Sequence, residues 1–555
     1  MPFKMKEVYE QDKERIEVLN DKTLKTRTDS ISSKKQQGGF KLLIDIFKGT
    51  VISLFLMITD VLSVGTAFFD LNLSEAEKGP YKECQDKLNE LSYIIFNISM
   101  MLSTLIYTNF GSLKTFMIGS AVFESRNITS DIARTVFDYF IKQGVSKQNI
   151  PNMVLLNTYL VCCLFVIIVS LVYIIIYYSK IGNYLKKIPI LAVNVIGGKI
   201  GISLMLLPIL PIINNPSTNN LIKISIVAVS AVLIVLVETF LHFDFAIPCL
   251  LIGSCTVVYL FSGKINNEHR VDQLFLEYDF SNFKKIFNNS SIAWGVLLKC
   301  LPIIIKGVIL CVILFTINIV TISSKLNASI DMNVEYLVNG GANFLSLFIG
   351  LPVYPSASYT IYLNSIGCKS KWISYATVIT FLLFIVTVFK WMVQYIPVTF
   401  TDTVFVYVGI SIFKSSVIDM VKVCSMFDIT ILTLGIMLDF TTDLVGFFFT
   451  IAVVTSRILL EYIKNPISEK PKNTGDISII KIDYILCYMT LDRFENDLRR
   501  ITPDTLIDLN DCPFIDTDVN LRLISLIKEK KINRLTGRPA NFYFDKIAPL
   551  CQFIQ

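Results

Sequence analysis

Charged and hydroxyl side chains interrupt several long apolar stretches of this sequence, and these are the residues that could do chemistry. Thr59 and Asp60 lie inside the first apolar run, and Glu124 ends a short glycine-flanked segment. Lys306 lies about halfway along an apolar run over residues 293–322. A charged side chain at the centre of a bilayer costs at least about 2.5–3.5 kcal/mol, and it usually faces a cavity or a partner. These positions therefore indicate a polar pathway within a membrane domain.

The stretch over residues 335–367, EYLVNGGANFLSLFIGLPVYPSASYTIYLNSIG, is the strongest candidate for a binding site. Glycines and Pro352 interrupt its apolar run before it can span, and Ser356 and Ser358 are hydroxyl residues suited to starting a new helix. A break between two half-helices is tolerated in a bilayer only where it lines a cavity. The positive end of the new helix would attract an anion or another polar solute. The alternative is a kinked helix followed by a loop.

A second interrupted segment, FGSLKTFMIGSAVFES, occupies residues 110–125 in the first half of the chain. It is too short to cross a bilayer as a helix. We expect a polar link over residues 126–152 after it. Paired interruptions at corresponding positions of two halves are the best sequence indication of a transporter's midplane site.

The composition identifies the class of protein. Hydrophobic residues make up 53% of the 555 residues, which excludes an ordinary soluble domain and indicates a polytopic membrane protein in contact with lipid. The net charge of +6 is modest and requires no nucleic-acid partner. The twelve cysteines form no CxxC pair and there are only two histidines, so we expect no metal site, no cofactor and no disulfide framework. An enzyme is not expected, because no nucleophile, base and oxyanion set is recognisable.

Apolar runs and polar ends divide the chain into four parts. Residues 1–40 read as a disordered cytoplasmic tail without a signal peptide, residues 41–465 as the membrane domain, and residues 466–476 as a linker before a soluble module over 477–555. Besides the two interrupted segments, spans are expected near 46–69, 91–108, 153–178, 182–211, 220–241, 243–262, 293–322, 372–392, 396–415, 428–444 and 445–463, with a polar loop over 263–291.

The last module alternates strand and helix patterns. ISIIKIDYILCY and TLIDLNDCPFID read as strands, and LDRFENDLRRI and VNLRLISLIKEKK as amphipathic helices. The expected module is a small α/β domain.

The lysines between spans fix the expected orientation. Lys180, Lys186 and Lys187 follow one span, and Lys369 and Lys371 follow the second half-helix. With a cytoplasmic N-terminus and about fourteen segments, both clusters lie inside, as the positive-inside rule requires. We therefore expect both termini in the cytoplasm, with the protein in the plasma membrane or in a vacuolar or other endomembrane.

Two motifs resemble a known family. NVEYLVNGGANFLSLFIGLPVYPSASYT is similar to the signature of SulP anion transporters, and LIDLNDCPFIDTD resembles the strand and loop of the STAS domain that follows in that family. The segments FLMITDVLSVG and MIGSAVFES are closer to the divergent fungal vacuolar SulP-like branch. The matching signature positions are Asn333, Glu335, Gly340 or Gly341, Asn343, Pro352, Ser356 and Ser358.

The resemblance implies a seven-plus-seven inverted repeat that works by an elevator movement, in a homodimer. It implies a core domain (41–178 and 293–392) that moves against a gate domain (179–262 and 393–465). Substrate, sulfate-like by family, would lie between the two half-helices. The residues expected to bind it are Ser356, Ala357, Ser358, Tyr359, Phe116, Gly119, Ser120, Thr59, Asp60 and Lys306.

One departure from the family pattern concerns the charge at this site. Typical members carry an arginine where this chain has Tyr359, and a phenol cannot supply a permanent positive charge. Our hypothesis is that Lys306 supplies it from a neighbouring helix; the alternative is a lysine that snorkels or lines a water-filled seam. Phe116 and Tyr359 are candidate pocket walls.

The remaining candidates divide into coupling and structural residues. Asp60 and Glu124 are candidates for proton or cation coupling, with a structural pairing as the alternative. Glu335, Asn343 and Pro352 are expected to hold the broken helices.

Two further functions stay open. The transported solute could be neutral, such as a nucleobase, because a related permease family shares the seven-plus-seven fold and lacks the arginine. The other alternative is a transport-inactive scaffold or sensor that acts through the STAS-like module. There Asp516 matches the acid before a loop that is phosphorylated in some bacterial relatives, and Asp518 replaces their serine; packing against the cytosolic face or a dimer partner is the expected role.

Overall fold

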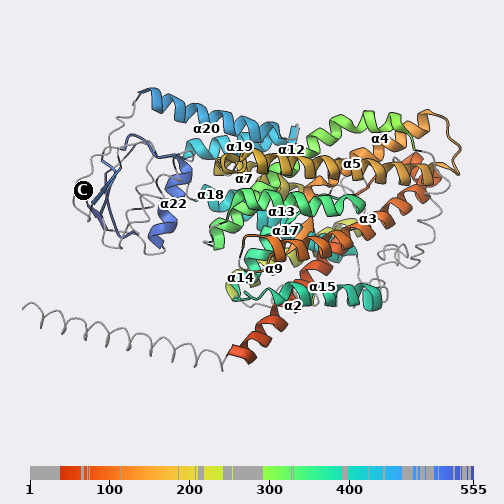
Figure 1. Cartoon of the computed structure of the whole chain (residues 1–555), viewed down its shortest axis with the longest axis horizontal. Helices are drawn as coiled ribbons and strands as arrows, with labels where there is room; N and C mark the ends of the chain where they lie inside the picture. The colour runs from red at the N-terminus through yellow and green to blue at the C-terminus, as the bar shows by residue number, and fades with distance from the viewer. Residues whose placement is uncertain are drawn as a thin grey trace, which may run out of the picture.

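Long helices running along one axis form most of the molecule, and a small sheet lies at one end of them (Figure 1). The computed structural model describes residues 38–206, 218–241, 292–389 and 398–464, with short gaps, and parts of 479–554. The predicted span at 243–262, the loop at 263–291, the linker and nearly all of the tail lie outside the described residues.

The membrane part consists of helices and two short strands. The strands are β1 (Gly119–Ala121) and β2 (Val353–Pro355). The helices are α2 (Gly38–Ser63), α3 (Glu75–Phe110), α4 (Arg126–Lys142), α5 (Ile150–Ser179), α6 (Gly182–Leu185), α7 (Ile190–Leu206), α9 (Thr218–Leu241), α12 (Trp294–Leu326), α13 (Met332–Leu345), α14 (Ala357–Ser365), α15 (Trp372–Phe384), α17 (Val398–Phe413), α18 (Asp419–Val421), α19 (Met426–Thr441) and α20 (Val445–Lys464), with the single turns η1 (Phe123–Ser125), η3 (Ser346–Phe348), η4 (Ile385–Phe389) and η5 (Lys414–Ile418).

Among the described residues, six helices are long and apolar enough to cross a membrane. In α5 the mean hydropathy reaches 3.1. Large apolar side chains remain exposed on the outer surfaces of these helices, including Leu298 at 75% and Ile463 at 74%. Such surfaces would be unfavourable in water and suit contact with lipid tails. The prediction of a polytopic helical membrane protein is therefore confirmed.

Two predictions about the first half are wrong in detail. The polar link expected over 126–152 is mostly helix, because α4 begins at Arg126 and α5 at Ile150. Within α4, Ile128, Ile132 and Val136 recur every fourth residue and are buried, so the segment is amphipathic rather than a loop. The span expected over 182–211 is divided into α6 and α7, with Pro189 before the first residue of α7.

The membrane helices pack as two bundles. In the first bundle, α2, α3, α4, α5, α12, α13, α14 and α15 surround β1 and β2; in the second bundle, α7, α9, α17, α19 and α20 pack on one another. Helix α17 also contacts α2 across the boundary. The division into a core and a gate domain stays a prediction, as does their relative movement.

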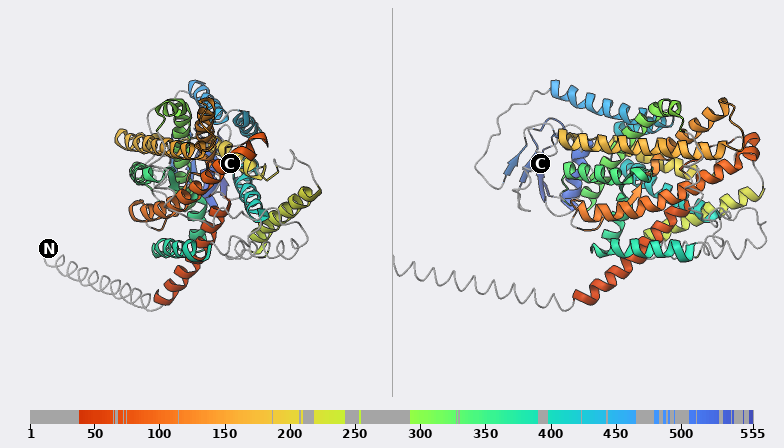
Figure 2. Two further views of the ribbon diagram at one scale, coloured as in Figure 1. Left: turned by 90° about the vertical axis from the view of Figure 1, so that its right-hand side faces the viewer. Right: turned by 45° about the vertical axis from the view of Figure 1, so that its right-hand side comes forward.

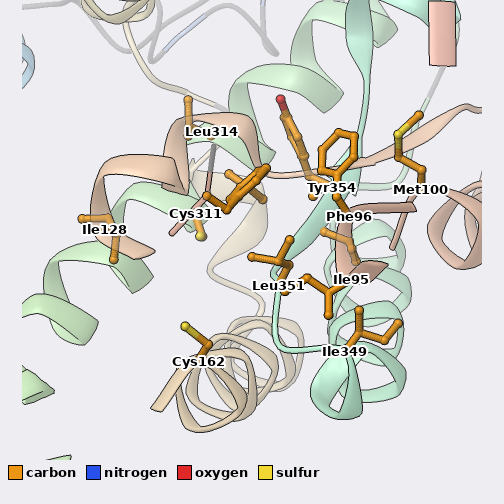
Figure 3. Packing of buried hydrophobic residues seen from close by; sticks show 14 of the residues in the cluster. Ile95, Phe96, Met100, Ile128, Cys162, Cys311, Leu314, Ile349, Leu351 and Tyr354 are labelled. Carbon is orange, nitrogen blue, oxygen red and sulfur yellow. The ribbon is translucent and has the colours of Figure 1, made fainter. Parts of the chain in front are cut away.

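The turn that leads into β2 packs in the centre of the first bundle. Leu351 and Tyr354 lie among side chains of α3, such as Phe96, and of α12, such as Leu314 (Figure 3). Leu351 has no exposed surface. The interruption in the second half of the chain is therefore a buried, well-packed element rather than a surface loop.

The described residues of the C-terminal unit include four short parallel strands in sequential order: β3 (Ile479–Lys481), β4 (Leu506–Asp508), β5 (Arg534–Thr536) and β6 (Gln552–Ile554). Helix α22 (Thr517–Lys528) connects β4 to β5. Its buried Val519, Leu523 and Ile527 recur every fourth residue and join the core of this unit. The observed alternation of strand and helix agrees with the α/β prediction, although most of the predicted helix over 491–501 lies outside the described residues.

The first turn of α22 connects the C-terminal unit to the second bundle, and α22 lies between the sheet and the membrane helices (Figures 1 and 2). The Thr517 hydroxyl donates to Asp428 of α19 at 2.9 Å, and the Asp518 carboxylate accepts from the Ile190 backbone N–H of α7 at 2.9 Å. Arg457 of α20 pairs with Asp428 and lies over the ring of Phe514. Charge and ring contacts thus fix the C-terminal unit against one bundle.

Substitution of Asp518 is expected to flatten the pH dependence of stability. Burial, together with the carboxylates of Asp516 and Asp428, raises the pKa of Asp518 well above its ordinary value of about 3.9. The stability from the neutral acid is complete below that ordinary pKa and is lost as the pH rises through the raised folded-state pKa. Wild-type protein in detergent should unfold at lower temperature as the pH rises from 4 to 8, whereas Asp518→Asn should respond less.

The matched control is Asp508→Asn, whose side chain accepts from Asn510 within its own turn. Its unfolding temperature should depend on pH as steeply as that of the wild-type protein. If the unfolding temperature of Asp518→Asn depends on pH as steeply as that of wild type, the Asp518 carboxylate has the same proton affinity in the folded and unfolded states.

Candidate functional site

The two interrupted segments meet as an antiparallel strand pair. Gly119 lies opposite Pro355, and Ala121 lies opposite Val353. Two further backbone bonds extend the pairing: Val122 N–H donates to the Pro352 carbonyl at 2.8 Å, and Ser356 N–H donates to the Ile118 carbonyl at 2.8 Å. Each break thus supplies hydrogen-bond partners for the other, as a non-helical backbone at membrane depth requires.

Side chains of α3 and α14 satisfy further backbone groups beside β1. The Thr104 hydroxyl accepts from Gly119 N–H at 3.0 Å, and the Thr360 hydroxyl accepts from Ile118 N–H at 3.2 Å. Gly119 is required here, since a Cβ at this position would lie 2.5 Å from the backbone carbon of Ser103. The strand therefore lies directly on α3.

Asn343 supports the other strand. Its side-chain amide donates to the Val353 carbonyl at 3.0 Å, and its side-chain oxygen accepts from Val353 N–H at 2.9 Å. Glu335 is fully buried and accepts from both the backbone N–H and the hydroxyl of Ser112 at 2.6 Å. Neither side chain lines the cavity described below, so both hold the backbone beside the breaks.

Two tyrosine–carboxylate pairs connect the breaks to neighbouring elements. The Tyr359 hydroxyl in α14 donates to Asp60 of α2. The Tyr354 hydroxyl in β2 donates to Glu124 at 3.2 Å. The two carboxylates predicted for coupling are therefore each held by a phenol from the second interrupted segment. Thr59 instead donates to the Phe55 carbonyl of its own helix.

The first turn of α14 is held by a residue that sequence reasoning missed. Ala357 N–H donates to the side-chain oxygen of Asn318 on α12 at 3.1 Å. The Ser356 side chain makes no capping bond to α14, and Ser358 is exposed. The signal for Asn318 was an amide inside the apolar run over residues 293–322, the run that contains Lys306.

A cavity of about 130 Å³ lies between the two bundles, next to the first break. Glu124, Arg126 and Asn127 line it at the start of α4, and Lys306 lines it from α12. The second bundle supplies Ile196, Lys199, Ile200, Ser203 and Leu204 of α7, and Asp439 of α19. The remaining lining residues are Phe123, Ile128, Leu310 and Leu444.

Cations are the distinctive feature of this cavity. Lys306 was predicted from the sequence, whereas Arg126 and Lys199 were not. Arg126 lies 4.0 Å from Asp70, and Lys199 lies 3.3 Å from Asp439. The signal for Arg126 was its position directly after the ES that ends the first interrupted segment.

Other predicted binding residues are not in the cavity lining. Phe116 is fully buried in the core of the first bundle, and Ser120 is buried in β1. Among the described residues, no group of three or more His, Cys, Asp or Glu side chains could hold a metal ion. The cavity wall instead combines the cations Arg126, Lys199 and Lys306 with the carboxylates of Glu124 and Asp439.

No protein-family model and no curated protein matches the chain. Solved structures are similar to it at low identity. The transmembrane domain of a cyanobacterial bicarbonate transporter, BicA, shares 14% identity and a TM-score of 0.45, covering 74% of this chain and 98% of BicA's. A structure of SLC26A9 shares 13% identity and a TM-score of 0.48, covering 94% and 88%. The murine Slc26a9 anion transporter in the inward-facing state shares 14% identity and a TM-score of 0.44, and the match covers 91% of this chain and 87% of that chain. At these scores, the similarity does not by itself identify the function.

Loss of the Asn343 amide should destabilise the strand pair. In Asn343→Ala, the buried Val353 N–H and carbonyl lose their side-chain partner, and an unsatisfied buried backbone group costs about 1–3 kcal/mol. We expect a lower unfolding temperature for the purified protein in detergent, with reduced solute binding.

The matched control is Asn364→Ala, because the buried Asn364 side chain donates to the Thr360 carbonyl of its own helix. Its effect should be smaller. Equal destabilisation by both variants would mean that Asn343 does not support the strand pair specifically.

Proposed function

We propose that this protein is a secondary transporter of a small anion, in which the first bundle moves as an elevator against the second. One observation carries the proposal: two interrupted segments from different halves of the chain pair within a membrane-spanning bundle. Discontinuous segments that meet in this way are typical of transporter substrate sites. A purely structural bundle would gain nothing from breaking two helices, because continuous helices satisfy the backbone without help.

The charge for an anion comes from outside α14 in this proposal. Tyr359 stands where SulP-like sequences have arginine, and its hydroxyl is engaged by Asp60. Arg126 and Lys306 of the first bundle line the neighbouring cavity. They would provide the positive charge, and the resemblance to SulP makes an inorganic or small organic anion, sulfate-like by family, the expected substrate class.

The position of the cavity supports the elevator movement. Its lining comes from both bundles, with Lys306 on one side and Lys199 on the other. A solute held there would be bound partly by the first bundle, which could carry it past the second. Alternating access by rigid-body movement of one part against another is the common solution for such folds.

Asp60 and Glu124 would couple transport to protons. Each carboxylate accepts a hydrogen bond from a tyrosine of the second break. Protonation would change that bond, and at Glu124 it would also change the charge of the cavity wall. Inward proton movement could in this way drive anion uptake.

The C-terminal unit would be of the STAS type, cytosolic, and packed on the second bundle through Thr517 and Asp518. We propose a homodimer with both termini in the cytoplasm, in the plasma membrane or an endomembrane. The contacts of Thr517 and Asp518 with the second bundle also favour the scaffold alternative. In that alternative the membrane domain transports no solute, and the STAS-like unit senses its conformation.

A neutral solute is the second candidate. Tyr359 in place of arginine favours it, and the carboxylates of Asp60 and Glu124 could accept hydrogen bonds from the N–H groups of a nucleobase. In this case Lys306 would have no charge to bind, which separates the two candidates.

Purified protein in liposomes should take up at least one of chloride, bicarbonate, sulfate and acetate, and none of a set of nucleobases. Lys306→Ala should raise the KM about tenfold, because it removes one charge-assisted contact. Lys299→Ala is the matched control, since Lys299 lies on the same helix, is exposed and stacks on Tyr139. Uptake of nucleobases alone would support the second candidate, and uptake of none would favour the scaffold.

Asp60→Asn should weaken the response of anion uptake to an imposed pH gradient, because an amide retains the contact with Tyr359 but cannot exchange a proton. The measurement is the initial rate of radiolabelled anion uptake at equal and unequal pH across the liposome membrane. Asp45→Asn, near the start of the same helix, should keep the wild-type response. A variant whose gradient response equals that of wild type would exclude Asp60 from coupling.

A further inference from the structure

The ion pair between Lys199 and Asp439 has an unusual arrangement for a structural contact. It joins α7 to α19 within the second bundle at 3.3 Å, and the Asp439 side chain is only 2% exposed. The second oxygen, Oδ1 of Asp439, is buried and has no hydrogen-bond partner among the described residues. A buried carboxylate that is only half satisfied is costly, and buried ion pairs often stabilise less than apolar replacements would.

This pair also lies in the wall of the cavity between the bundles. The charged groups that line the cavity with it are Glu124 and Arg126 from the first break and Lys306 from α12. Gly446 and Thr450 of α20 lie close to α19 at this level, and neither carries a charge. The carboxylate of Asp439 is therefore an anion already bound to a cation of the cavity.

We infer that Asp439 is a built-in competitor for the transported anion, and that Lys199 is the anion's contact on the second bundle. Before an anion enters, the carboxylate contacts the Lys199 ammonium at 3.3 Å. An entering anion displaces it and takes over the ammonium, and on release the carboxylate returns. This inference rests on the proposed transport of an anion and deepens it.

The competitor indicates the class of ligand. Asp439 presents one charge on a planar pair of oxygens, so exchange for another singly charged oxyanion leaves the charge balance at Lys199 unchanged. The displaced carboxylate has other donors in the same cavity, since Ser203 and Asn127 also line it. The ligand class is therefore a small monocarboxylate or a bicarbonate-like anion that fits within about 130 Å³.

A competitor lowers apparent affinity and speeds release. The apparent dissociation constant equals the intrinsic constant divided by the fraction of protein in which Lys199 is accessible. Removal of the carboxylate should therefore strengthen binding and slow turnover together. A merely structural ion pair would weaken binding, or leave it unchanged, when it is broken.

The test compares uptake of bicarbonate and acetate by wild-type protein, Asp439→Asn, Lys199→Gln and the double variant in liposomes. Asp439→Asn should lower the KM several-fold and also lower kcat, and Lys199→Gln should raise the KM. In the Lys199→Gln background, Asp439→Asn should have no further effect, because the two side chains act through one contact. A higher KM for Asp439→Asn, or the same change with and without Lys199, would overturn the inference.

Asp419→Asn is the matched control, because Asp419 of α18 forms an exposed ion pair with Lys422 shortly before α19. It should leave KM and kcat unchanged. If it shifts them as Asp439→Asn does, the effect is general to the bundle and the inference fails while the proposed function stands. A wild-type protein that neither takes up nor is thermally stabilised by any of the four anions would overturn both.

Folding of the variant is itself informative. Asp439→Asn removes the carboxylate that contacts Lys199, and bicarbonate or acetate should take its place. The unfolding temperature of Asp439→Asn should therefore rise more with these anions than that of wild type. A variant that stays unfolded even at saturating anion would contradict the exchange of carboxylate for ligand.

Discussion

The pairing of β1 with β2 is the constraint on which the rest of the membrane domain depends. A bilayer offers no water to an unpaired backbone group, so each interruption is tolerated only because the other supplies its partners. The surrounding side chains follow from this requirement. Asn343, Thr104 and Thr360 satisfy backbone groups beside the strands, and Gly119 lets β1 lie directly on α3. Polar residues in these helices are thus required by the breaks.

The same pairing explains where the reactive groups gather. Because β1 leads into η1 and α4, Glu124 and Arg126 follow the first break at once. Tyr354 lies in β2, and Tyr359 lies in α14, which follows β2. The Tyr354 hydroxyl donates to Glu124, and the Tyr359 hydroxyl donates to Asp60. Glu124 and Arg126 line the same cavity as Lys199 of the second bundle. Charged side chains are therefore concentrated in the cavity between the two bundles.

The C-terminal unit is attached by chemistry of a different kind. Its contact combines the hydrogen bonds of Thr517 and Asp518 with the stacking of Arg457 on Phe514. These groups contact α7, α19 and α20, all from the second bundle. Among the described residues, these contacts attach the C-terminal unit to the second bundle.

The sequence alone determined the helical membrane class, the two interruptions and the α/β pattern of the C-terminal unit, because hydropathy, glycine, proline and strand–helix periodicity are local properties. It also located Asp60, Glu124 and Lys306, since a charge in an apolar run is visible without a fold. It missed α4, whose apolar face has a helical period within a polar composition, and it missed Asn318. Only the tertiary structure decided which groups meet. The contact of Tyr359 with Asp60 joins residues that are 299 positions apart in the sequence. The contact of Lys199 with Asp439 joins two helices, and the sequence pattern of neither helix predicts that it packs on the other.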